Sequence, residues 1–550
     1  MNLISDFLPV TEFTSYEQLM RDFKVNVKPD FNFAFDVVDK YAELEPEKLA
    51  LVWRNDSGEE KFITFKEVSN ESNRIANMLY SKGVRKGEHV LIMLMSRYEY
   101  WFTVVACHKL GAIAIPATSQ LTSKDIAYRC NYANVKCIIS VNTSSVTGYV
   151  KNALPDCKSV KHAFTVGGAD GFEDFHKEYS RFDGDKLDFE HKNTASEPML
   201  AYFTSGTTGM PKMVTHNYAY AAAHIATAYL WHCCRDGGLH FTAADTGWAK
   251  ASWGKIYGQW ICGSANFIYD YYGKYTPLDV LPLLEKYKVT TFCAPPTMYR
   301  FLIKEDLSKY DLSSIEHYCT AGEPLNPVVY EQIKSKIGKS IYEGYGQTET
   351  VLALGTFPCM EPRPASMGKP CPLYAIELLD DNGKPVPDGV EGEICIKYNP
   401  EQIGLFMGYN TFEKMRSVWN DGYYHTGDVA TRDSDGYFWF VGRDDDIIKS
   451  SGYRIGPFEV ESALLEHPSV MECAITAVPD DVRGQIIKAT VVLARNFFPS
   501  DELIKELQDH VKHTTAPYKY PRVIEFVDRL PKTISEKIRR VEIRENDKKN

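Results

Sequence analysis

The chain of 550 residues is too long for one small domain, because compact domains typically span about 100 to 200 residues. Its 44% hydrophobic and 25% charged residues are typical of globular proteins and exclude wholesale disorder. With 62 basic and 73 acidic residues the chain carries a formal charge of −11, which argues against binding nucleic acid or an anionic membrane.

The cysteines and the N-terminus indicate the compartment. Thirteen cysteines lie scattered between Cys107 and Cys473 without a CxxC pair, so we expect reduced core thiols. The N-terminus lacks the basic and apolar regions of a secretory signal and is not Arg-rich like a transit peptide. The most apolar long stretch, residues 104–117, contains His108 and Lys109 and is too short to cross a bilayer. We therefore expect a cytoplasmic protein without stable membrane insertion.

Short β-type runs alternate with helical stretches through the first 320 residues, which predicts wound α/β sheets. These runs are residues 89–95, 112–117, 137–141, 199–203, 290–294 and 317–320. Between residues 361 and 397, turns rich in Pro, Gly and Asp surround short strands such as residues 394–397. This pattern of turn residues around short strands predicts a small β subdomain that caps the large domain.

The pattern changes after Asp445. It predicts helices at residues 458–466 and 501–512 and strands at residues 472–477, 486–493 and 523–527. About 105 residues suffice for an independent α+β domain. We therefore expect a large domain over residues 1–444 and a small one over residues 445–550, with the charged residues 539–550 as a frayed, solvated end.

The strongest local signal is a run rich in glycine and hydroxyl groups directly after the strand-like residues 199–203. It consists of Thr204, Ser205, Gly206, Thr207, Thr208, Gly209, Met210, Pro211 and Lys212. Glycines let the backbone approach oxyanions, the hydroxyl groups donate hydrogen bonds, and the lysine supplies positive charge, so the run suits a polyphosphate. A polar surface turn is the alternative. The spacing differs from GxxxxGK[ST], which disfavours a P-loop ATPase or kinase.

Further motifs follow this loop in order. They are Gly322-Glu323-Pro324, Glu343-Gly344-Tyr345-Gly346-Gln347-Thr348-Glu349, Thr426-Gly427-Asp428 and Arg443. Each alone would be an ordinary turn or an exposed polar residue. In this order, over nearly the whole chain, they resemble the adenylate-forming superfamily. The segment Asp245-Thr246-Gly247-Trp248 resembles the medium-chain acyl-CoA synthetases within it, which are AMP-forming acid-thiol ligases.

The resemblance implies a role for each motif in binding ATP or AMP. Tyr345 would lie against adenine beside the loop of Gly322, Glu323 and Pro324, and Asp428 and Arg443 would bind the ribose. Thr348 would reach the α-phosphate and Glu349 would hold Mg²⁺, a hard cation that needs oxygen ligands. Glu343, Gly344, Gly346, Gln347 and Arg454 complete the implied nucleotide site.

The resemblance also implies a hinge at Asp445, about which a mobile C-terminal domain rotates between two half-reactions. Lys537 matches the adenylation lysine, which would neutralise charge as the acid and the α-phosphate meet. The preceding residue, ordinarily glycine in the family, is Glu536 here, so impaired adenylation is a hypothesis. The implied CoA contacts are Gln120, Ser451, Gly452, Tyr453 and Arg483.

These observations predict an AMP-forming acyl-CoA synthetase that uses Mg²⁺, ATP and CoA, with Trp248 as a wall of the acyl pocket. The acid would be of short, medium or branched chain, because a bulky tryptophan leaves little room for a very long one. The alternatives are an aryl-acid CoA ligase and a nucleotide-binding homologue in which Glu536 impairs adenylation. A homodimer is compatible with the sequence.

Overall fold

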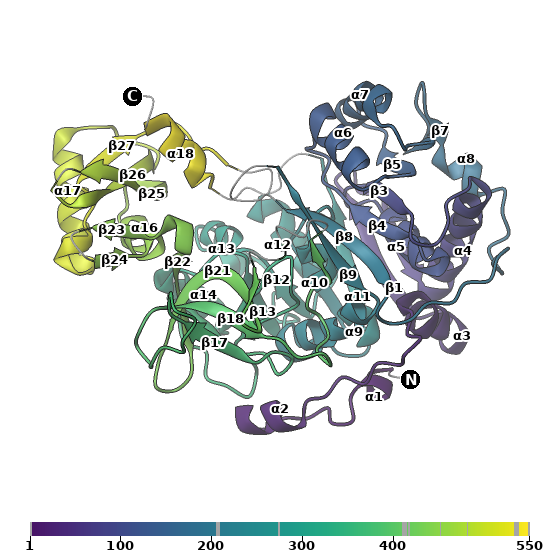
Figure 1. The fold of residues 1–550 in the computed structure, drawn as a ribbon, viewed down its shortest axis with the longest axis horizontal. Helices are drawn as coiled ribbons and strands as arrows, with labels where there is room; N and C mark the ends of the chain where they lie inside the picture. The colour runs from purple at the N-terminus through teal and green to yellow at the C-terminus, as the bar shows by residue number, and fades with distance from the viewer. Residues whose placement is uncertain are drawn as a thin grey trace.

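The computed structural model describes residues 3–204, 210–272, 276–409, 415, 418–450, 453–480, 482–532 and 538–547. A large N-terminal α/β domain with mixed sheets is followed by a smaller C-terminal domain, as the alternation of strands and helices predicts (Figure 1). Some of the predicted functional residues lie outside the described residues: Ser205, Gly206, Thr207, Thr208, Gly209, Ser451, Gly452, Glu536 and Lys537.

An eight-stranded sheet carries the predicted phosphate loop at one end. Its strand order is β19-β9-β8-β4-β3-β5-β6-β7, parallel from β8 through β7 and antiparallel at β9 and β19. The strands are β3 (His89–Met93), β4 (Ile113–Pro116), β5 (Cys137–Val141), β6 (His162–Val166), β7 (Glu173–Asp174), β8 (Pro198–Thr204), β9 (Lys212–Asn217) and β19 (Gly408–Tyr409). The central strands are almost wholly apolar because helices cover the sheet. These helices are α4 (Phe65–Ser81), α5 (Glu99–Leu110), α6 (Ser123–Tyr132), α7 (Ser144–Ala153) and α8 (Phe175–Tyr179).

A second, larger sheet changes from parallel to antiparallel in its middle. The parallel side comprises β1 (Leu49–Asn55), β10 (Leu239–Thr242), β11 (Ala265–Asp270), β12 (Thr291–Cys293), β13 (His317–Ala321) and β14 (Ile341–Tyr345), with β2 (Glu60–Thr64) antiparallel at the edge. The antiparallel side comprises β15 (Leu354–Gly355), β16 (Ser366–Pro370), β17 (Ile376–Leu379), β18 (Gly392–Lys397), β20 (Trp419–Asn420), β21 (Tyr423–Arg432) and β22 (Phe438–Arg443). The predicted β subdomain is therefore continuous with the large sheet.

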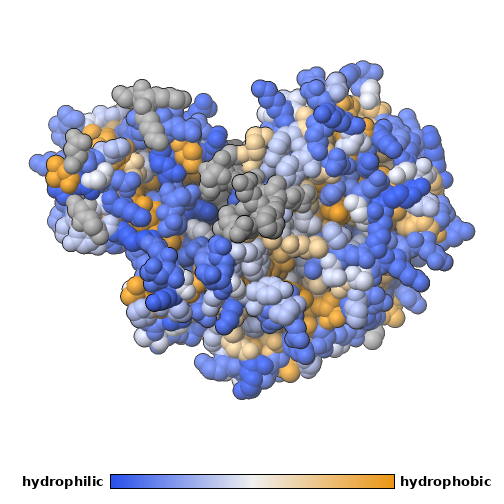
Figure 2. Space-filling view, in the orientation of Figure 1, coloured by the Kyte–Doolittle hydropathy of each residue, from blue (hydrophilic) through white to orange (hydrophobic). Residues whose placement is uncertain are grey.

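Short helices pack around this sheet and at the start of the chain. They are α1 (Ile4–Phe7), α2 (Tyr16–Asp22), α3 (Lys40–Leu44), α9 (Ala219–Ile225), α10 (Lys250–Gly254), α11 (Tyr257–Ile261), α12 (Pro277–Lys286), α13 (Pro296–Leu302) and α14 (Pro327–Ile337). None of the described helices is both long and apolar enough to cross a membrane. On the face seen in Figure 2, hydrophobic side chains form separate groups within a mostly hydrophilic surface.

The C-terminal domain builds its own core around the antiparallel pair β25 (Val470–Asp480) and β26 (Gly484–Leu493), with β27 (Val523–Phe526) parallel to β26. Helices α16 (Pro457–Leu465), α17 (Asp501–Thr514) and α18 (Arg540–Asp547) and the hairpin of β23 (Ile448–Ser450) and β24 (Tyr453–Ile455) complete it. The predicted strands and helices of this domain are confirmed to within two or three residues. The thirteen cysteines are free, and all but Cys233 and Cys359 are buried, as expected of core thiols.

The prediction of a frayed, solvated C-terminal tail is wrong for residues 540–547. These residues form α18, which packs on β25 through Ile543. Arg540 donates two hydrogen bonds, of 2.6 and 2.8 Å, to the carboxylate of the buried Glu461, and Arg544 pairs with Asp446 at 2.5 Å. Charge alone predicts solvation, but here the opposite charges lie inside the fold and dock the helix.

We predict that Arg540→Ala destabilises the C-terminal domain by about 3 kcal/mol or more, because it leaves the Glu461 carboxylate buried and unpaired. Arg539→Ala is the control, since the Arg539–Glu542 pair is largely exposed and worth less than about 1 kcal/mol. Native-state hydrogen exchange of the β25 amides measures both changes. Equal protection in the two variants would contradict the prediction.

Candidate functional site

The change of strand direction after β14 brings two predicted motifs together. β13 and β14 are parallel neighbours, and Ala321 at the end of β13 pairs with Gly344 near the end of β14. The loop of Gly322, Glu323 and Pro324 therefore begins beside Tyr345 at the carboxyl ends of the strands, where open α/β sheets bind ligands. Gly322 has φ +105°, a backbone conformation that favours glycine.

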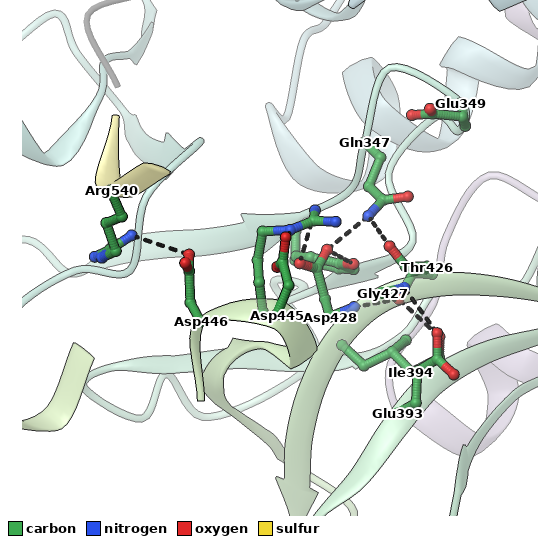
Figure 3. A network of polar contacts seen from close by, with 12 residues as sticks. Gln347, Glu349, Glu393, Ile394, Thr426, Gly427, Asp428, Asp445, Asp446 and Arg540 are labelled. Atoms are coloured by element: carbon green, nitrogen blue, oxygen red, sulfur yellow. Dashed lines mark hydrogen bonds and ion pairs between the residues drawn. The ribbon is translucent and has the colours of Figure 1, made fainter. Parts of the chain in front are cut away.

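The carboxylate of Asp428 is the centre of a polar network that joins three strands (Figure 3). Its Oδ2 accepts hydrogen bonds of 2.6 Å from the Tyr345 hydroxyl group and 2.6 Å from Gln347 Nε2. Its Oδ1 lies 3.4 Å from Nη1 of Arg443, which faces Asp428 across β21 and β22. Three residues predicted to contact adenine or ribose thus hold one another in place.

Gln347 is oriented by further bonds from the strand that carries Asp428. Its Nε2 also donates to the Thr426 carbonyl at 2.9 Å, and its Oε1 accepts from the Tyr424 hydroxyl group at 2.7 Å. Both ends of the amide are therefore engaged. The sequence motif placed Gln347 in the nucleotide site, but only the fold shows that it connects the segment after β14 to β21.

Glu349 and Lys212, the last residue of the predicted phosphate loop, both contact Tyr409. β8 and β9 are the two strands that flank this loop, and Thr204 pairs with Lys212 across them. Lys212 Nζ lies 5.0 Å from the centre of the Tyr409 ring, and the Tyr409 hydroxyl group donates to Glu349 Oε1 at 2.6 Å. Burial raises the pKa of the Glu349 carboxyl group, and the nearby Lys212 ammonium opposes that shift.

Sequence reasoning missed Tyr409 and His216. Tyr409 lies in the two-residue strand β19, which is too short to show a periodicity. The sequence analysis gave His216 no role, yet its Nε2 donates to the Thr348 carbonyl at 2.8 Å, and complete burial lowers the pKa of its ring to about 3. The neutral imidazole therefore positions the backbone at Thr348.

Glu343 lies within the sheet rather than at its edge. Its side chain is buried, and its Oε1 accepts a 3.2 Å hydrogen bond from the amide of Leu325, directly after Pro324. Burial raises the pKa of Glu343 to about 8, so the carboxyl group is mostly protonated near neutral pH. The Glu343 side chain thus holds the loop after β13 in place.

The two glycines of the same motif pack closely against tryptophans. A Cβ atom at Gly344 would lie 2.6 Å from Trp231, and one at Gly346 would lie 2.4 Å from Trp253.

The segment predicted to line the acyl pocket lies against the loop of Gln120. A Cβ atom at Gly247 would lie 2.2 Å from the Thr118 amide nitrogen, so these backbones are in direct contact. Trp248 is half-buried and Gln120 is exposed. Lys250 donates to the carbonyl of Ala321 at 2.6 Å, which ties this segment to the end of β13.

The remaining predicted residues are more dispersed. Exposed Arg483 lies in the turn directly before β26, beside the β23–β24 hairpin, where Gln485 accepts a bond from the Lys449 amide. Tyr453 of the hairpin stacks on Tyr518 at 4.2 Å. Arg454 pairs with Asp444 at 3.3 Å and lies within 4 Å of Asp381 and Glu391, not in the Asp428 network. Met210 is exposed, and Pro211 accepts a bond from the Tyr128 hydroxyl group.

Comparison with known proteins shows the family to which the chain belongs. The AMP-binding enzyme family model matches residues 38–410, and the model of the AMP-binding enzyme C-terminal domain matches residues 459–537. The mouse protein named acyl-coenzyme A synthetase ACSM3, mitochondrial, is 40% identical, over 99% of this chain and 96% of its own. The 4-hydroxybutyrate–CoA ligase 1 of Metallosphaera sedula is 41% identical, over 94% and 91%. The crystal structure of the anthranilate CoA ligase AuaEII with anthranoyl-AMP has a TM-score of 0.86 at 28% identity, over 94% and 98%.

We predict that Tyr345→Phe weakens ATP binding by about tenfold or more, because it removes a hydrogen bond to a carboxylate and keeps the ring. Tyr342→Phe is the matched control, since Tyr342 is on the same strand but packs on His317. Equilibrium titration of both variants with ATP measures the effect. Equal affinities would show that the hydroxyl group does not orient Asp428.

We also predict that Glu343 destabilises the fold as the pH rises. Its pKa is about 8 in the fold and 4.5 without burial, so the folded chain binds more protons between these values. Stability from this group is fully present below pH 4.5 and is lost as the pH rises through 8. Glu343→Gln should therefore have a higher melting temperature than the wild type, and the difference between the two should grow from pH 5 to pH 8.

Melting curves at several pH values measure this difference. Glu401→Gln, at an exposed position, is the control and should track the wild type. A constant difference between Glu343→Gln and the wild type across the pH range would contradict the assignment.

Proposed function

The chain belongs to the AMP-binding enzyme family, and from this premise we propose that it is an acyl-CoA synthetase acting on short, medium or branched-chain acids. The carboxylate of the acid would attack the α-phosphorus of ATP and release pyrophosphate. The thiol of CoA would then attack the acyl carbon and release AMP. The observation that carries the proposal is the Asp428 network, formed by motif residues in a chain 40% identical to an acyl-coenzyme A synthetase over nearly its full length.

In the first half-reaction the chain's main task is to position anions and neutralise their charge. Tyr345 would pack on adenine while its hydroxyl group fixes Asp428, whose carboxylate would accept bonds from the ribose hydroxyl groups. Residues 204–212 would hold the phosphates with backbone amides, hydroxyl groups and the Lys212 ammonium group. Thr348, held by His216, would donate to the α-phosphate.

Glu349 fits the role of a magnesium ligand. It offers a nine-tenths buried carboxylate, the hard oxygen donor that Mg²⁺ prefers. The Tyr409 hydroxyl group holds this carboxylate, and Lys212 lies over the ring of the same tyrosine. Bound Mg²⁺ would neutralise charge on the phosphates. The cation would also favour the ionised form of Glu349, whose pKa burial raises.

Contacts on either side of Asp445 support the proposed hinge. Arg443 is held by Asp428 in the large domain. Asp446 pairs with Arg540 of the C-terminal domain (Figure 3) and also with Arg544. Asp445 therefore lies between one residue anchored to each side, where a backbone rotation would be concentrated. Rotation there would move Lys537 away from the acyl-adenylate and bring the β23–β24 hairpin, which carries Tyr453, toward it. Arg483 and Gln120 would be further CoA contacts.

The comparisons favour an aliphatic acid over an aromatic one. A relative at 41% identity is named for 4-hydroxybutyrate, an aliphatic acid, whereas the anthranilate ligase is 28% identical. The half-buried Trp248 would limit the depth of the acyl pocket. The aryl-acid ligase therefore stays the second candidate. The homodimer and the cytoplasmic location stay predictions, and the ACSM3 relatives are named as mitochondrial.

The decisive test measures release of AMP and pyrophosphate from Mg-ATP with linear, branched and aromatic acids, with and without CoA. We expect CoA-dependent turnover that is highest for one aliphatic acid class. Highest turnover with an aromatic acid would favour the aryl-acid ligase. ATP binding without turnover for any acid would contradict the synthetase.

Two variants separate lost chemistry from a missing substrate. Lys537→Ala should abolish adenylation and keep the conversion of supplied acyl-AMP to acyl-CoA. Glu536→Gly restores the ordinary family residue. If Glu536→Gly gains pyrophosphate release while the wild type has none, the impaired-adenylation hypothesis is correct.

A further inference from the structure

Three metal-ligating side chains gather on one face of the β subdomain, beside the site described above. Nδ1 of His425 lies 2.7 Å from Glu393 Oε2 and 3.4 Å from Cys395 Sγ. One ligand atom from each residue lies within 4.8 Å of the others. None of the three has a role in the proposed reaction.

Strand register explains this gathering. Cys395 of β18 pairs with His425 of β21 on one side and with Glu377 of β17 on the other. Glu393 lies two residues before Cys395, and alternate residues of a strand point to the same face. Two carboxylates, an imidazole and a thiol therefore share a face, and the acidic pair favours a cation over an anion.

The donor set specifies the kind of cation. Thiol and imidazole ligands favour Zn²⁺ and similar transition metals over Mg²⁺, and three protein ligands plus water complete a tetrahedral site. Bond lengths of about 2.0 to 2.3 Å place neighbouring ligand atoms about 3.3 to 3.6 Å apart. The distance between Sγ and Nδ1 already fits, and that between Oε2 and Nδ1 would widen by less than about 1 Å.

Exposure to solvent distinguishes this cluster from a second group of possible metal ligands. His232, Cys234 and His240 also lie close together, but all three are buried, and both nitrogens of His240 already bond threonine hydroxyl groups. In the first cluster the Cys395 thiol is buried, whereas the side chains of His425 and Glu393 are 21% and 27% exposed. A hydrated ion can therefore reach these two ligands from solvent.

We propose that Glu393, Cys395 and His425 bind Zn²⁺ or a similar thiophilic divalent metal, and that the metal weakens nucleotide binding at Asp428. In the metal-free chain, Glu393 Oε1 accepts a 2.8 Å hydrogen bond from the Gly427 amide (Figure 3). Thr426 is fixed to the Ile394 carbonyl and accepts from the Asp428 amide. The turn that carries Asp428 is thus attached to Glu393 and its strand, and movement of Glu393 toward a metal disturbs it.

The binding step balances as a ligand exchange. The ion forms three bonds, to sulfur, nitrogen and oxygen, keeps one water molecule and releases its other water ligands to solvent. The Cys395 thiol gives its proton to solvent, and the proton of the neutral His425 ring moves from Nδ1 to Nε2, which frees Nδ1 for the metal. No oxidant or reductant is needed, so a chelator should reverse the process.

Cobalt is the probe, because a Co²⁺–thiolate bond produces a charge-transfer absorption band. Titration of the chelator-treated full chain with Co²⁺ should give this band at one equivalent, and Zn²⁺ should displace it. Cys395→Ser should lose the band and at least about tenfold in affinity. His425→Gln should also lose affinity at least about tenfold, and circular dichroism checks that both variants are folded. Cys359→Ser, which changes a half-buried thiol elsewhere, should behave as the wild type.

The effect on the nucleotide site is measured separately with a non-hydrolysable acyl-adenylate analogue. Saturating Zn²⁺ should weaken its binding to the wild type by about fivefold or more and leave binding to Cys395→Ser unchanged. An absent cobalt band, or an equal band in Cys395→Ser, would overturn the metal site. Unchanged analogue affinity with metal bound would overturn the coupling. No analogue binding to the metal-free chain would contradict the proposed function and leave the metal site standing.

Discussion

The position of the Asp428 carboxylate is the constraint on which the site depends. One carboxylate accepts bonds from Tyr345 at the end of β14 and from Gln347 beyond it, and pairs with Arg443 of β22. These residues come from both the parallel and the antiparallel sides of the large sheet. A buried carboxylate is tolerated only where donors satisfy it, so the bonds that hold Asp428 also join the two sides of the sheet. In the proposed function, nucleotide recognition would therefore depend on the same contacts that join the two sides of the sheet.

The sequence predicted much of the fold because its signals are local. Apolar runs of four to seven residues predicted strands such as β5 and β8. The change in the pattern of helices and strands after Asp445 predicted the C-terminal domain. The motif resemblance assigned Tyr345, Asp428 and Arg443 to a common site, and the strand pairing brings them together. Such assignments succeed because glycine-rich turns and their polar neighbours are compact in sequence.

What the sequence did not predict depends on contacts between distant residues. Tyr409 holds Glu349 from a strand of two residues, and His216 holds Thr348 across 132 positions, so neither carries a local pattern. The tail at residues 540–547 is charged, which predicts solvation, but Arg540 finds a buried partner in Glu461. Glu343 was assigned to the nucleotide by its motif, whereas the fold turns it inward to the Leu325 amide. In each case packing decides what a side chain contacts.

The strength of the contacts around Asp445 bears on how the two half-reactions could alternate. On the C-terminal side, Asp446 and Glu461 bind Arg540 and Arg544 in pairs that are largely buried, and breaking such pairs costs several kcal/mol. Across the domains, Arg454 reaches Asp381 and Glu391 at 3.7 to 3.9 Å in partly exposed pairs, each worth at most about 1 kcal/mol. A rotation at Asp445 would break the weak pairs and keep the strong ones. The distribution of charge therefore favours movement of the C-terminal domain as a unit, with α18 attached, rather than unfolding of its edge.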